Sequence, residues 1–153
     1  MKRFYSIFVL LTLLACNKLD EVVYSSLTDD NAFTTAENAQ AAVNSIYAPL
    51  HSLYREPMFY INDIASDTGF KNGNCFEVMN DNSIYNDNRT LVAWNHLFQI
   101  ASRANIVIDR VPEMSDNLFR NGLSKKQMHG EAYVMRAFAY YNLPEVFYRV
   151  PLV

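Results

Sequence analysis

The stretch of residues 67–88, DTGFKNGNCFEVMNDNSIYNDN, holds the side chains best suited to chemistry. Nine of its 22 residues are Asn or Asp, which favour turns and local backbone hydrogen bonds over regular structure. Their oxygens could bind Ca²⁺, but the densest clusters, residues 80–82 and 86–88, lack the glycine and terminal glutamate of an EF-hand loop. Loops of this length are usually functional or disordered. Three scattered aromatic residues, Phe70, Phe76 and Tyr85, favour a structured polar excursion, with a disordered segment as the alternative.

The chain carries no pattern typical of an enzyme or a metal site. His51, His96 and His129 are 45 and 33 residues apart, and no His-Glu-x-x-His pair is present. The sequence also lacks Gly-x-Ser-x-Gly and a glycine-rich phosphate loop. Cys75 has no evident base beside it, and a lone thiol in a polar loop is more often incidental than catalytic. We therefore expect a protein that is not an enzyme and uses no metal or cofactor.

Cys16 stands directly after a short apolar run near the start of the chain. Lys2 and Arg3 precede about a dozen mostly apolar residues, 4–15, which are too few to cross a membrane as a helix but are typical of a secretory signal. The run ends in Leu-Leu-Ala-Cys, which resembles the lipobox of bacterial lipoproteins, where the cysteine is acylated and becomes the new N-terminus. Several acyl chains anchor a protein firmly, at about 0.8 kcal/mol per buried methylene. We expect residues 1–15 to be a signal peptide and Cys16 to be lipidated, with an unmodified cysteine as the alternative.

The residues that follow the cysteine form a short charged segment. Lys18-Leu19-Asp20-Glu21 resembles the lysine-and-acid signal that sends lipoproteins to the outer leaflet of the outer membrane. A solvated charged tether is an equally acceptable interpretation. We assign residues 16–33 to a lipidated tether and residues 34–153 to one helical domain.

The composition excludes some functions and favours a helical fold. Removal of residues 1–15 takes away Lys2 and Arg3 and lowers the formal net charge from −3 to −5. A mildly acidic chain without a basic stripe is unsuited to nucleic acids, whose binding depends on Lys and Arg contacts to phosphate. Only four glycines occur in the chain, which favours helices over a turn-rich sandwich. With Cys16 lipidated, Cys75 has no partner for an intramolecular disulfide.

Residues 34–53 carry the pattern of an amphipathic helix. Thr34 and Glu37 match a capping box, and apolar residues then recur at spacings of 4, 3, 4 and 3, which form one face of a helix. These residues are Ala39, Val43, Ile46, Leu50 and Leu53. Pro49 removes the hydrogen bond to the carbonyl of Ser45, so we expect the helix to bend or end early there.

Two further helices are predicted downstream. One apolar face is followed by Pro112, which stops the helix; it comprises Trp94, Leu97, Ala101, Ala104, Ile108 and Val111. The next helix begins with the cap pair Ser124 and Gln127 and has Pro144 near its end; its face comprises Met128, Ala132, Met135, Ala139 and Leu143. Gly130 inside this helix costs about 1 kcal/mol relative to Ala, which predicts that a neighbouring helix packs closely against it.

Three blocks of the chain resemble a known family in their order and spacing. Residues 25–50, SSLTDDNAFTTAENAQAAVNSIYAPL, place a Thr/Asp-rich turn before an Ala-rich helix. Residues 94–111, WNHLFQIASRANIVIDRV, hold a Trp, a nearby aromatic residue and an Ala-Asn pair. Residues 130–143, GEAYVMRAFAYYNL, contain Gly-Glu-Ala, then Arg-Ala, then aromatic residues. In this order, after a lipobox, the blocks resemble the SusD/RagB family of outer-membrane nutrient-binding lipoproteins. The resemblance covers the mature chain, and its last block is the most specific.

The end of the chain departs from the family pattern. Pro144-Glu145 stand where the family usually has aliphatic residues, and Tyr148-Arg149 stand where it usually has glycine and an acidic or polar residue. The resemblance therefore does not predict where the third helix ends or how the chain turns after it. Because family members continue for several hundred residues, we expect this chain to correspond to the first third of such a protein.

The resemblance implies a fold, a location and partners. The fold is all-α, a tetratricopeptide-like helical scaffold with a long irregular Asn/Asp-rich loop. The location is the outer membrane, where a lipid anchor holds the protein with its surface exposed to the cell exterior. The partners are a TonB-dependent (SusC-like) transporter and an oligosaccharide or other small nutrient, with no nucleic acid.

By the same analogy, part of the glycan site comes from the Asn/Asp-rich loop and the start of the next helix. Aromatic faces stack on sugar rings, and Asn, Asp and Arg side chains hydrogen-bond the hydroxyl groups. The candidate ligand-binding residues are Asp67, Asn72, Asn74, Phe76, Tyr85 and Arg89; for each, a solvated or turn-forming role is the alternative.

Three other residues of the matching blocks are expected to be structural. Trp94 lies in the apolar register, so we favour a core position over ligand stacking. Glu131 and Arg136 are five residues apart and do not face each other on one helix; each is expected to pair with a neighbouring helix. A lipid-tethered helical scaffold that makes only protein contacts remains the alternative to a nutrient-binding protein.

Overall fold

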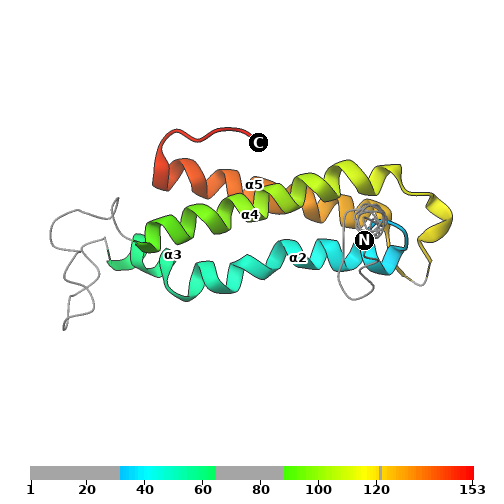
Figure 1. Ribbon diagram of the computed structural model, residues 1–153, viewed down its shortest axis with the longest axis horizontal. Coiled ribbons are helices and arrows are strands. Elements are labelled where there is room, and N and C mark those ends of the chain that lie inside the picture. Colours follow the sequence, from blue (N-terminus) through cyan, green and yellow to red (C-terminus); the bar gives the residue numbers. More distant parts are fainter. Residues whose placement is uncertain (1–31, 65–87, 121) are drawn as a thin grey trace, which may run out of the picture.

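The computed structural model describes residues 32–64, 88–120 and 122–153, which form helices and turns with no strand among them. Three long helices lie side by side: α2 (Ala36–Arg55), α4 (Asn88–Arg110) and α5 (Lys125–Phe147) (Figure 1). Helix α4 runs antiparallel to α2 and α5 and contacts both. The prediction of an all-α, tetratricopeptide-like helical scaffold is confirmed. The expected signal peptide, most of the tether and the Asn/Asp-rich loop before Asn88 lie outside the described residues.

The start of α2 lies one residue later than the sequence pattern predicts. The N-cap is Thr35, whose hydroxyl accepts a hydrogen bond from the Asn38 amide at 3.2 Å. The predicted capping box of Thr34 and Glu37 is therefore wrong in register. Two adjacent threonines can each serve as a cap, and the helix starts at the second of them.

Pro49 does not end α2, which continues to Arg55. Proline at this position leaves the carbonyl of Ser45 without its helical hydrogen-bond donor. The guanidinium of Arg103 on α4 supplies that donor, with its Nη1 atom 2.5 Å from the Ser45 oxygen. A side chain 58 residues away in sequence thus satisfies the backbone group that the proline exposes.

After α2 the chain makes a tight reversal. Glu56 separates α2 from the short helix α3 (Pro57–Phe59), which has proline in its first turn, where no amide donor is needed. A π-helical turn, η1 (Tyr60–Ile64), follows directly. Tyr60 is only 1% exposed, so this turn is packed against the helices.

The core lies where the apolar faces of α2, α4 and α5 meet. The predicted faces are buried almost throughout: the fully buried residues include Ala39, Val43, Ile46, Leu53, Leu97, Ala101, Ala104, Ala132, Ala139 and Leu143. Leu50 and Trp94 are partly buried and pack against this cluster. The helical periodicity therefore identified the core correctly.

Hydrogen bonds from Lys125 stabilise the connection between α4 and α5. Helix α4 ends at Arg110, and Pro112 lies in the 3₁₀ turn η4 (Val111–Glu113), as the proline predicted. After a second 3₁₀ turn, η5 (Asp116–Leu118), the ammonium group of Lys125 donates to the carbonyl of Met114 at 2.5 Å and to Asp116 at 2.8 Å. The hydrogen bond from Lys125 and its charge lower the pKa of Asp116.

The predicted cap of α5 is confirmed, because Ser124 accepts a hydrogen bond from the Gln127 amide at 3.3 Å. The prediction for Gly130 is wrong: the residue is exposed, and a Cβ atom placed there would meet nothing within 4 Å. Close packing against a neighbour therefore does not explain this glycine.

A strained turn ends α5 at the position where the sequence departs from the family pattern. Helix α5 passes Pro144 and ends at Phe147, and Tyr148 takes φ 64° and ψ −63°. The Arg149 amide donates to the Phe147 carbonyl at 2.7 Å, which closes a γ-turn of the rare, strained kind. The chain then folds back, and the Val153 carbonyl accepts hydrogen bonds from Asn105 on α4 (2.7 Å) and Tyr140 on α5 (3.1 Å).

Replacing Gly130 by alanine is expected to stabilise the protein by about 1 kcal/mol, because alanine is the better helix former and the space is open. Gly122→Ala is the matched control: its φ of +83° disfavours any side chain, so this variant is expected to lose about 1 kcal/mol. Urea unfolding followed by circular dichroism measures both. A loss of stability in Gly130→Ala would contradict the assignment of Gly130 to an open helix surface.

Arg103→Met is expected to destabilise the protein by about 1.5–3 kcal/mol, because it removes a charged donor from the Ser45 carbonyl. In a Pro49→Ala background the new amide of residue 49 bonds that carbonyl, so the same substitution is expected to cost about 1 kcal/mol less. A double-mutant cycle by urea unfolding measures this coupling. An equal cost in both backgrounds would show that Arg103 does not compensate for Pro49.

Candidate functional site

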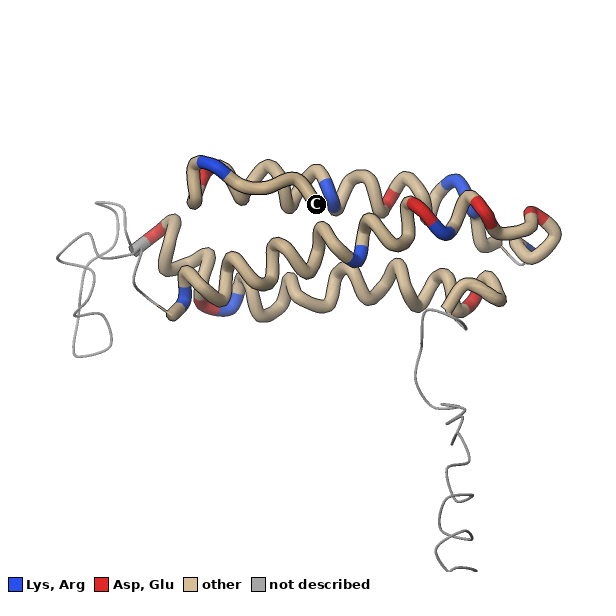
Figure 2. Tube along the Cα trace, turned by 45° about the horizontal axis from the view of Figure 1, so that its top comes forward, with Lys and Arg blue, Asp and Glu red and all other residues tan. Residues whose placement is uncertain are grey.

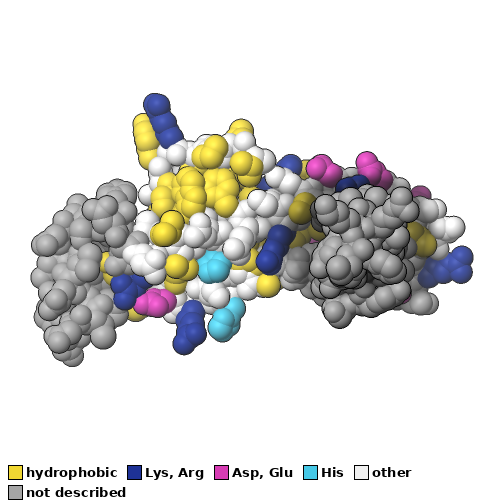
Figure 3. All heavy atoms as spheres, in the orientation of Figure 1, with side chains coloured by type: hydrophobic (Ala, Val, Ile, Leu, Met, Phe, Trp, Pro, Cys, Tyr) yellow, Lys and Arg dark blue, Asp and Glu magenta, His cyan; other side chains and the backbone are white. Residues whose placement is uncertain are grey.

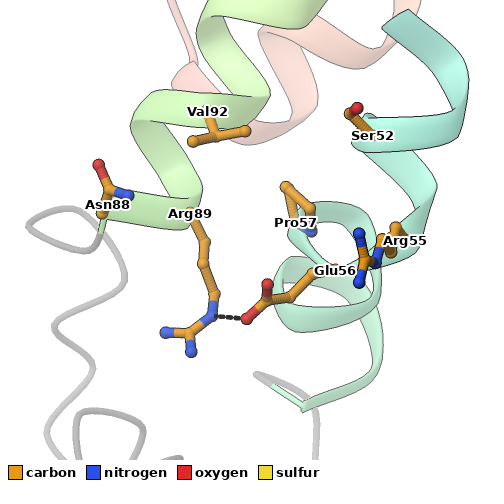
Figure 4. A pocket seen from close by; sticks show the side chains of 7 residues that line it. All are labelled: Ser52, Arg55, Glu56, Pro57, Asn88, Arg89 and Val92. Carbon is orange, nitrogen blue, oxygen red and sulfur yellow. Dashed lines mark hydrogen bonds and ion pairs between the residues drawn. The ribbon is translucent and has the colours of Figure 1, made fainter.

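A hollow of about 370 Å³ lies at the end of the helix bundle where α2 ends and α4 begins (Figure 4). Helix α2 and the following turn contribute the residues on one side, and the first turns of α4 contribute those on the other. Its lining residues are Ser52, Arg55, Glu56, Pro57, Asn88, Arg89 and Val92. The site therefore depends on the reversal at Pro57, which turns the end of α2 toward the start of α4.

Arg89 is held in a defined orientation at this hollow. Its Nε atom lies 2.6 Å from a carboxylate oxygen of Glu56, and its guanidinium lies 4.9 Å from the centre of the Tyr60 ring. The Arg89 and Glu56 side chains are 26% and 57% exposed, so this ion pair contributes at most about 1 kcal/mol to stability. Its main effect is to fix the direction of two charged groups.

The hollow combines donors and acceptors of hydrogen bonds over a small area. Arg55 and Arg89 are donors, the Glu56 carboxylate is an acceptor, and Ser52 and Asn88 can do both. Such a mixture suits a ligand rich in hydroxyl groups, each of which donates and accepts. A general acid–base pair is not formed here, because Arg stays protonated at all physiological pH values.

Residues of the three matching sequence blocks contact one another across the bundle. Arg136 on α5 donates to the Asn105 side chain on α4 at 3.1 Å. The Tyr47 side chain on α2 and the Glu131 carboxylate on α5 are hydrogen-bonded; burial raises the pKa of Tyr47, and Glu131 raises it further. The prediction that Glu131 and Arg136 each pair with a neighbouring helix is confirmed.

Trp94 is part of an aromatic cluster on the surface side of the core. Its ring lies 4.6 Å from that of Phe98 on the same helix and 4.9 Å from that of Phe147, which it meets edge to face. The edge-to-face contact with Phe147 is a favourable geometry for an aromatic pair, and the contact with Phe98 is tilted by 49°. Trp94 is partly buried and packs against the core, in agreement with the predicted core position.

Comparison with known proteins identifies the family. A family model described as "Starch-binding associating with outer membrane" matches residues 19–153. The chain belongs to the SusD-like family. Two curated relatives, SusD-like protein P38 and SusD-like protein P2 of Formosa agariphila, are each 27% identical to it, over 99% and 100% of this chain. These alignments cover 31% of each relative, so the chain spans about a third of their length. No solved structure matches the chain.

The SusD-like chain has one of its predicted ligand-binding residues in the described region. Arg89 lies in the hollow at the start of α4, where the resemblance placed part of a glycan site. The other candidates, Asp67, Asn72, Asn74, Phe76 and Tyr85, and the expected lipidation site Cys16, lie outside the described residues; for all seven residues the functional role remains a prediction.

Sequence reasoning missed two residues at the end of α2 that line the hollow opposite Arg89. Arg55 and Glu56 stand immediately before Pro57, at the end of an apolar helical pattern. Charged residues beside a proline that ends a helix mark an exposed turn, and this signal could have suggested them. Their approach to Arg89 could not be inferred locally, because Glu56 and Arg89 are 33 residues apart.

No group of three or more His, Cys, Asp or Glu side chains in residues 32–64, 88–120 and 122–153 is arranged to hold a metal ion. In the same ranges, no helix combines the length and the apolar character needed to cross a membrane.

Proposed function

We propose that the protein is a cell-surface lipoprotein that binds glycans or other nutrients and delivers them to a TonB-dependent transporter of the outer membrane. The observation that carries this proposal is the match of residues 19–153 to a SusD-like family described as starch-binding and associated with the outer membrane. The Leu-Leu-Ala-Cys sequence ending at Cys16 supports anchoring by a lipid.

The hollow at Arg89 supports the glycan-binding part of the proposal. Its lining offers guanidinium, carboxylate, amide and hydroxyl groups, the groups that hydrogen-bond sugar hydroxyls. Arg89 is already oriented by Glu56 and Tyr60, so that little conformational entropy is lost when a ligand binds. The other predicted site residues lie earlier in the chain, between residues 67 and 85, and belong to the part that the structure does not describe.

A second function, a lipid-tethered scaffold for protein contacts, is favoured by the outer face of α5. Three of its apolar side chains are well exposed: Tyr133 by 45%, Val134 by 66% and Tyr141 by 67%. Exposed apolar side chains on one helix are compatible with a protein interface. Figure 3 shows apolar side chains gathered on the face in view over the C-terminal part of α5 and the segment that follows it. This function is an alternative to nutrient binding, because a scaffold that makes only protein contacts needs no ligand site of its own.

The direct test is affinity electrophoresis of the full chain, purified in detergent from membranes, through native gels that contain soluble starch or one of a panel of other polysaccharides. We expect retardation in at least one gel, and starch is the first choice because of the family description. Serum albumin run in the same gels controls for sieving. Unchanged mobility in every gel would contradict glycan binding and favour the scaffold function.

A further inference from the structure

The turn that follows α5 holds one residue in a strained conformation and exposes it. Tyr148 has φ 64° and ψ −63° and is the one non-glycine residue with a positive φ in the part of the chain that the structure describes. Glycine adopts a positive φ readily, whereas a residue with a Cβ atom does so at a cost. Tyr148 is nevertheless 80% exposed, so burial of its ring does not offset the strain. Backbone strain of this kind clusters at functional sites, and the surface around Tyr148 is therefore a candidate.

The segment after this turn is fixed through its backbone. The Val153 carbonyl accepts hydrogen bonds from the side chains of Asn105 at 2.7 Å and Tyr140 at 3.1 Å. The Val153 amide donates to the Tyr140 hydroxyl at 2.7 Å. Because these contacts use backbone atoms, apolar side chains of the segment remain outside: Leu152 is 85% exposed, and Val153 is exposed as well. We call residues 148–153 the Tyr148 tip.

An aromatic contact adjoins the Tyr148 tip. Phe147, the last residue of α5, meets the Trp94 ring edge to face at 4.9 Å, and Val150 packs against the core. Figure 3 shows apolar side chains gathered at this end of α5 on the face in view. The tip therefore stands on a packed base, which presents its exposed apolar side chains in a fixed arrangement.

The one charge in the Tyr148 tip is positive. Arg149 is the single charged residue among residues 146–153, and Figure 2 shows no acidic position between the basic one after α5 and the chain end marked C. The Arg149 guanidinium lies 5.6 Å from the centre of the Tyr148 ring. Glu145 lies one turn before the tip and is hydrogen-bonded to Tyr141. A guanidinium binds phosphate well, and its apolar stem can lie along hydrocarbon while the charged head stays in water.

A lipid surface matches these features better than a second copy of the chain does. The membrane interface combines phosphate groups with hydrocarbon, and aromatic and aliphatic side chains enter it while basic residues contact the headgroups. In a symmetric contact between two copies, the same patch of each copy meets its counterpart, so the two Arg149 side chains would repel each other. A phospholipid surface is therefore the partner that this charge pattern favours.

A lipid-anchored chain can bring the Tyr148 tip to the membrane. Cys16, the expected lipidation site, precedes Ala32, the first described residue, by 16 residues, and a chain of this length reaches at most about 55 Å. Helix α5 runs in the same direction as α2 (Figure 1), so its end lies at the far end of the bundle from Ala32, about 35 Å away. The tip is therefore within reach of a bilayer that holds Cys16.

We propose that the Tyr148 tip inserts into the lipid surface to which the protein is anchored. Tyr148, Leu152 and Val153 enter the boundary between headgroups and acyl chains, and Arg149 contacts lipid phosphates. The inference rests on the proposed function for the lipid anchor and goes beyond it, because a second contact fixes the orientation of the bundle on the membrane. The hollow at Arg89 lies at the same end of the bundle as the tip, so this contact would set the distance between the hollow and the bilayer.

The test is fluorescence quenching in vesicles, with a single tryptophan placed at the tip. Trp94 is the only tryptophan of the chain, so the double variant Trp94→Phe/Tyr148→Trp emits from the tip alone. The full chain, purified in detergent, is reconstituted into vesicles of equal parts phosphatidylcholine and phosphatidylglycerol, with and without bromine in the acyl chains. We expect bromine to quench most of this emission, because it acts only on close approach. Arg149→Glu, added to the double variant, is expected to abolish most of the quenching through repulsion by the anionic lipid.

The matched control is the double variant Trp94→Phe/Tyr54→Trp, which carries the same anchor. Tyr54 is exposed on α2, and its ring contacts that of Phe138. Phe138 and Phe147 are nine residues apart, which places them on opposite sides of α5. The tryptophan of the control therefore lies away from the tip, and we expect bromine to leave its emission unchanged.

A second measurement uses the native tryptophan. Trp94 contacts Phe147 next to the tip, so its emission is also expected to be quenched in brominated vesicles. Tyr148→Ser/Leu152→Ser, which makes the tip polar, is expected to reduce this quenching. Circular dichroism establishes that each variant is folded, so that a lost signal is assigned to the tip.

The outcomes separate this inference from the proposed function. Absence of quenching at the tip, or equal quenching at the tip and at the control position, would overturn the inference. A shift of the tip emission to shorter wavelength in detergent alone, dependent on protein concentration, would also overturn it, because a second copy would then cover the tip. The proposed function is decided separately, since the polysaccharide gels contain no bilayer and the mass of the purified chain shows whether acyl groups are attached.

Discussion

The structure depends on the burial of α4 between two helices at once. Leu97, Ile100, Ala101 and Ala104 are all 0% exposed, and α4 contacts both α2 and α5. Alanines on all three helices, such as Ala39, Ala104 and Ala139, lie fully buried in this core; their small side chains allow the helix backbones to approach, and Leu97 and Ile100 fill the space between them. Since one side of α4 is committed to the core, its opposite side carries exposed residues such as Asn95, Gln99 and Ser102.

Polar contacts made by α4 add specificity to this apolar packing. Arg103 donates a hydrogen bond to the backbone carbonyl of Ser45 on α2, which Pro49 leaves without its helical donor. Asn105 accepts a hydrogen bond from Arg136 on α5 and donates one to the carbonyl of Val153. These contacts tie the matching blocks of the SusD-like family to one another. A rigid scaffold of this kind suits ligand binding, because the side chains that contact the ligand are already in position.

The sequence predicted the parts of the fold that follow from local periodicity. The apolar faces of the helices, the cap at Ser124 and the stop at Pro112 depend on neighbouring residues and were identified correctly. The cap of α2 was placed at Thr34 instead of Thr35, because both threonines satisfy the same local rule. Gly130 was assigned to close packing because that is a common reason for a helical glycine, yet its surroundings are open.

Features that depend on long-range contacts could not be predicted from the sequence. The local rule predicts a bend or an early end of α2 at Pro49. The helix continues to Arg55, and the donor that compensates for the proline is Arg103, 58 residues away. The hollow at Arg89 also depends on long-range contacts. Arg89 was a candidate by resemblance, but Arg55 and Glu56 join it in lining the hollow only because the chain reverses at Pro57. The γ-turn at Tyr148 occupies a position where the family usually has glycine, so the departure from the pattern marked the strain without showing its geometry.

The central claim, capture of glycans at the cell surface by a lipid-anchored helical protein, is tested most directly on intact cells. The chain has two cysteines, Cys16 and Cys75, which provide a matched pair of variants. We expect native cells that produce the unchanged chain or Cys75→Ala to bind fluorescently labelled maltoheptaose, and cells that produce Cys16→Ala at equal levels to lose this binding. Equal labelling of cells that carry the Cys16→Ala and Cys75→Ala variants would contradict the claim.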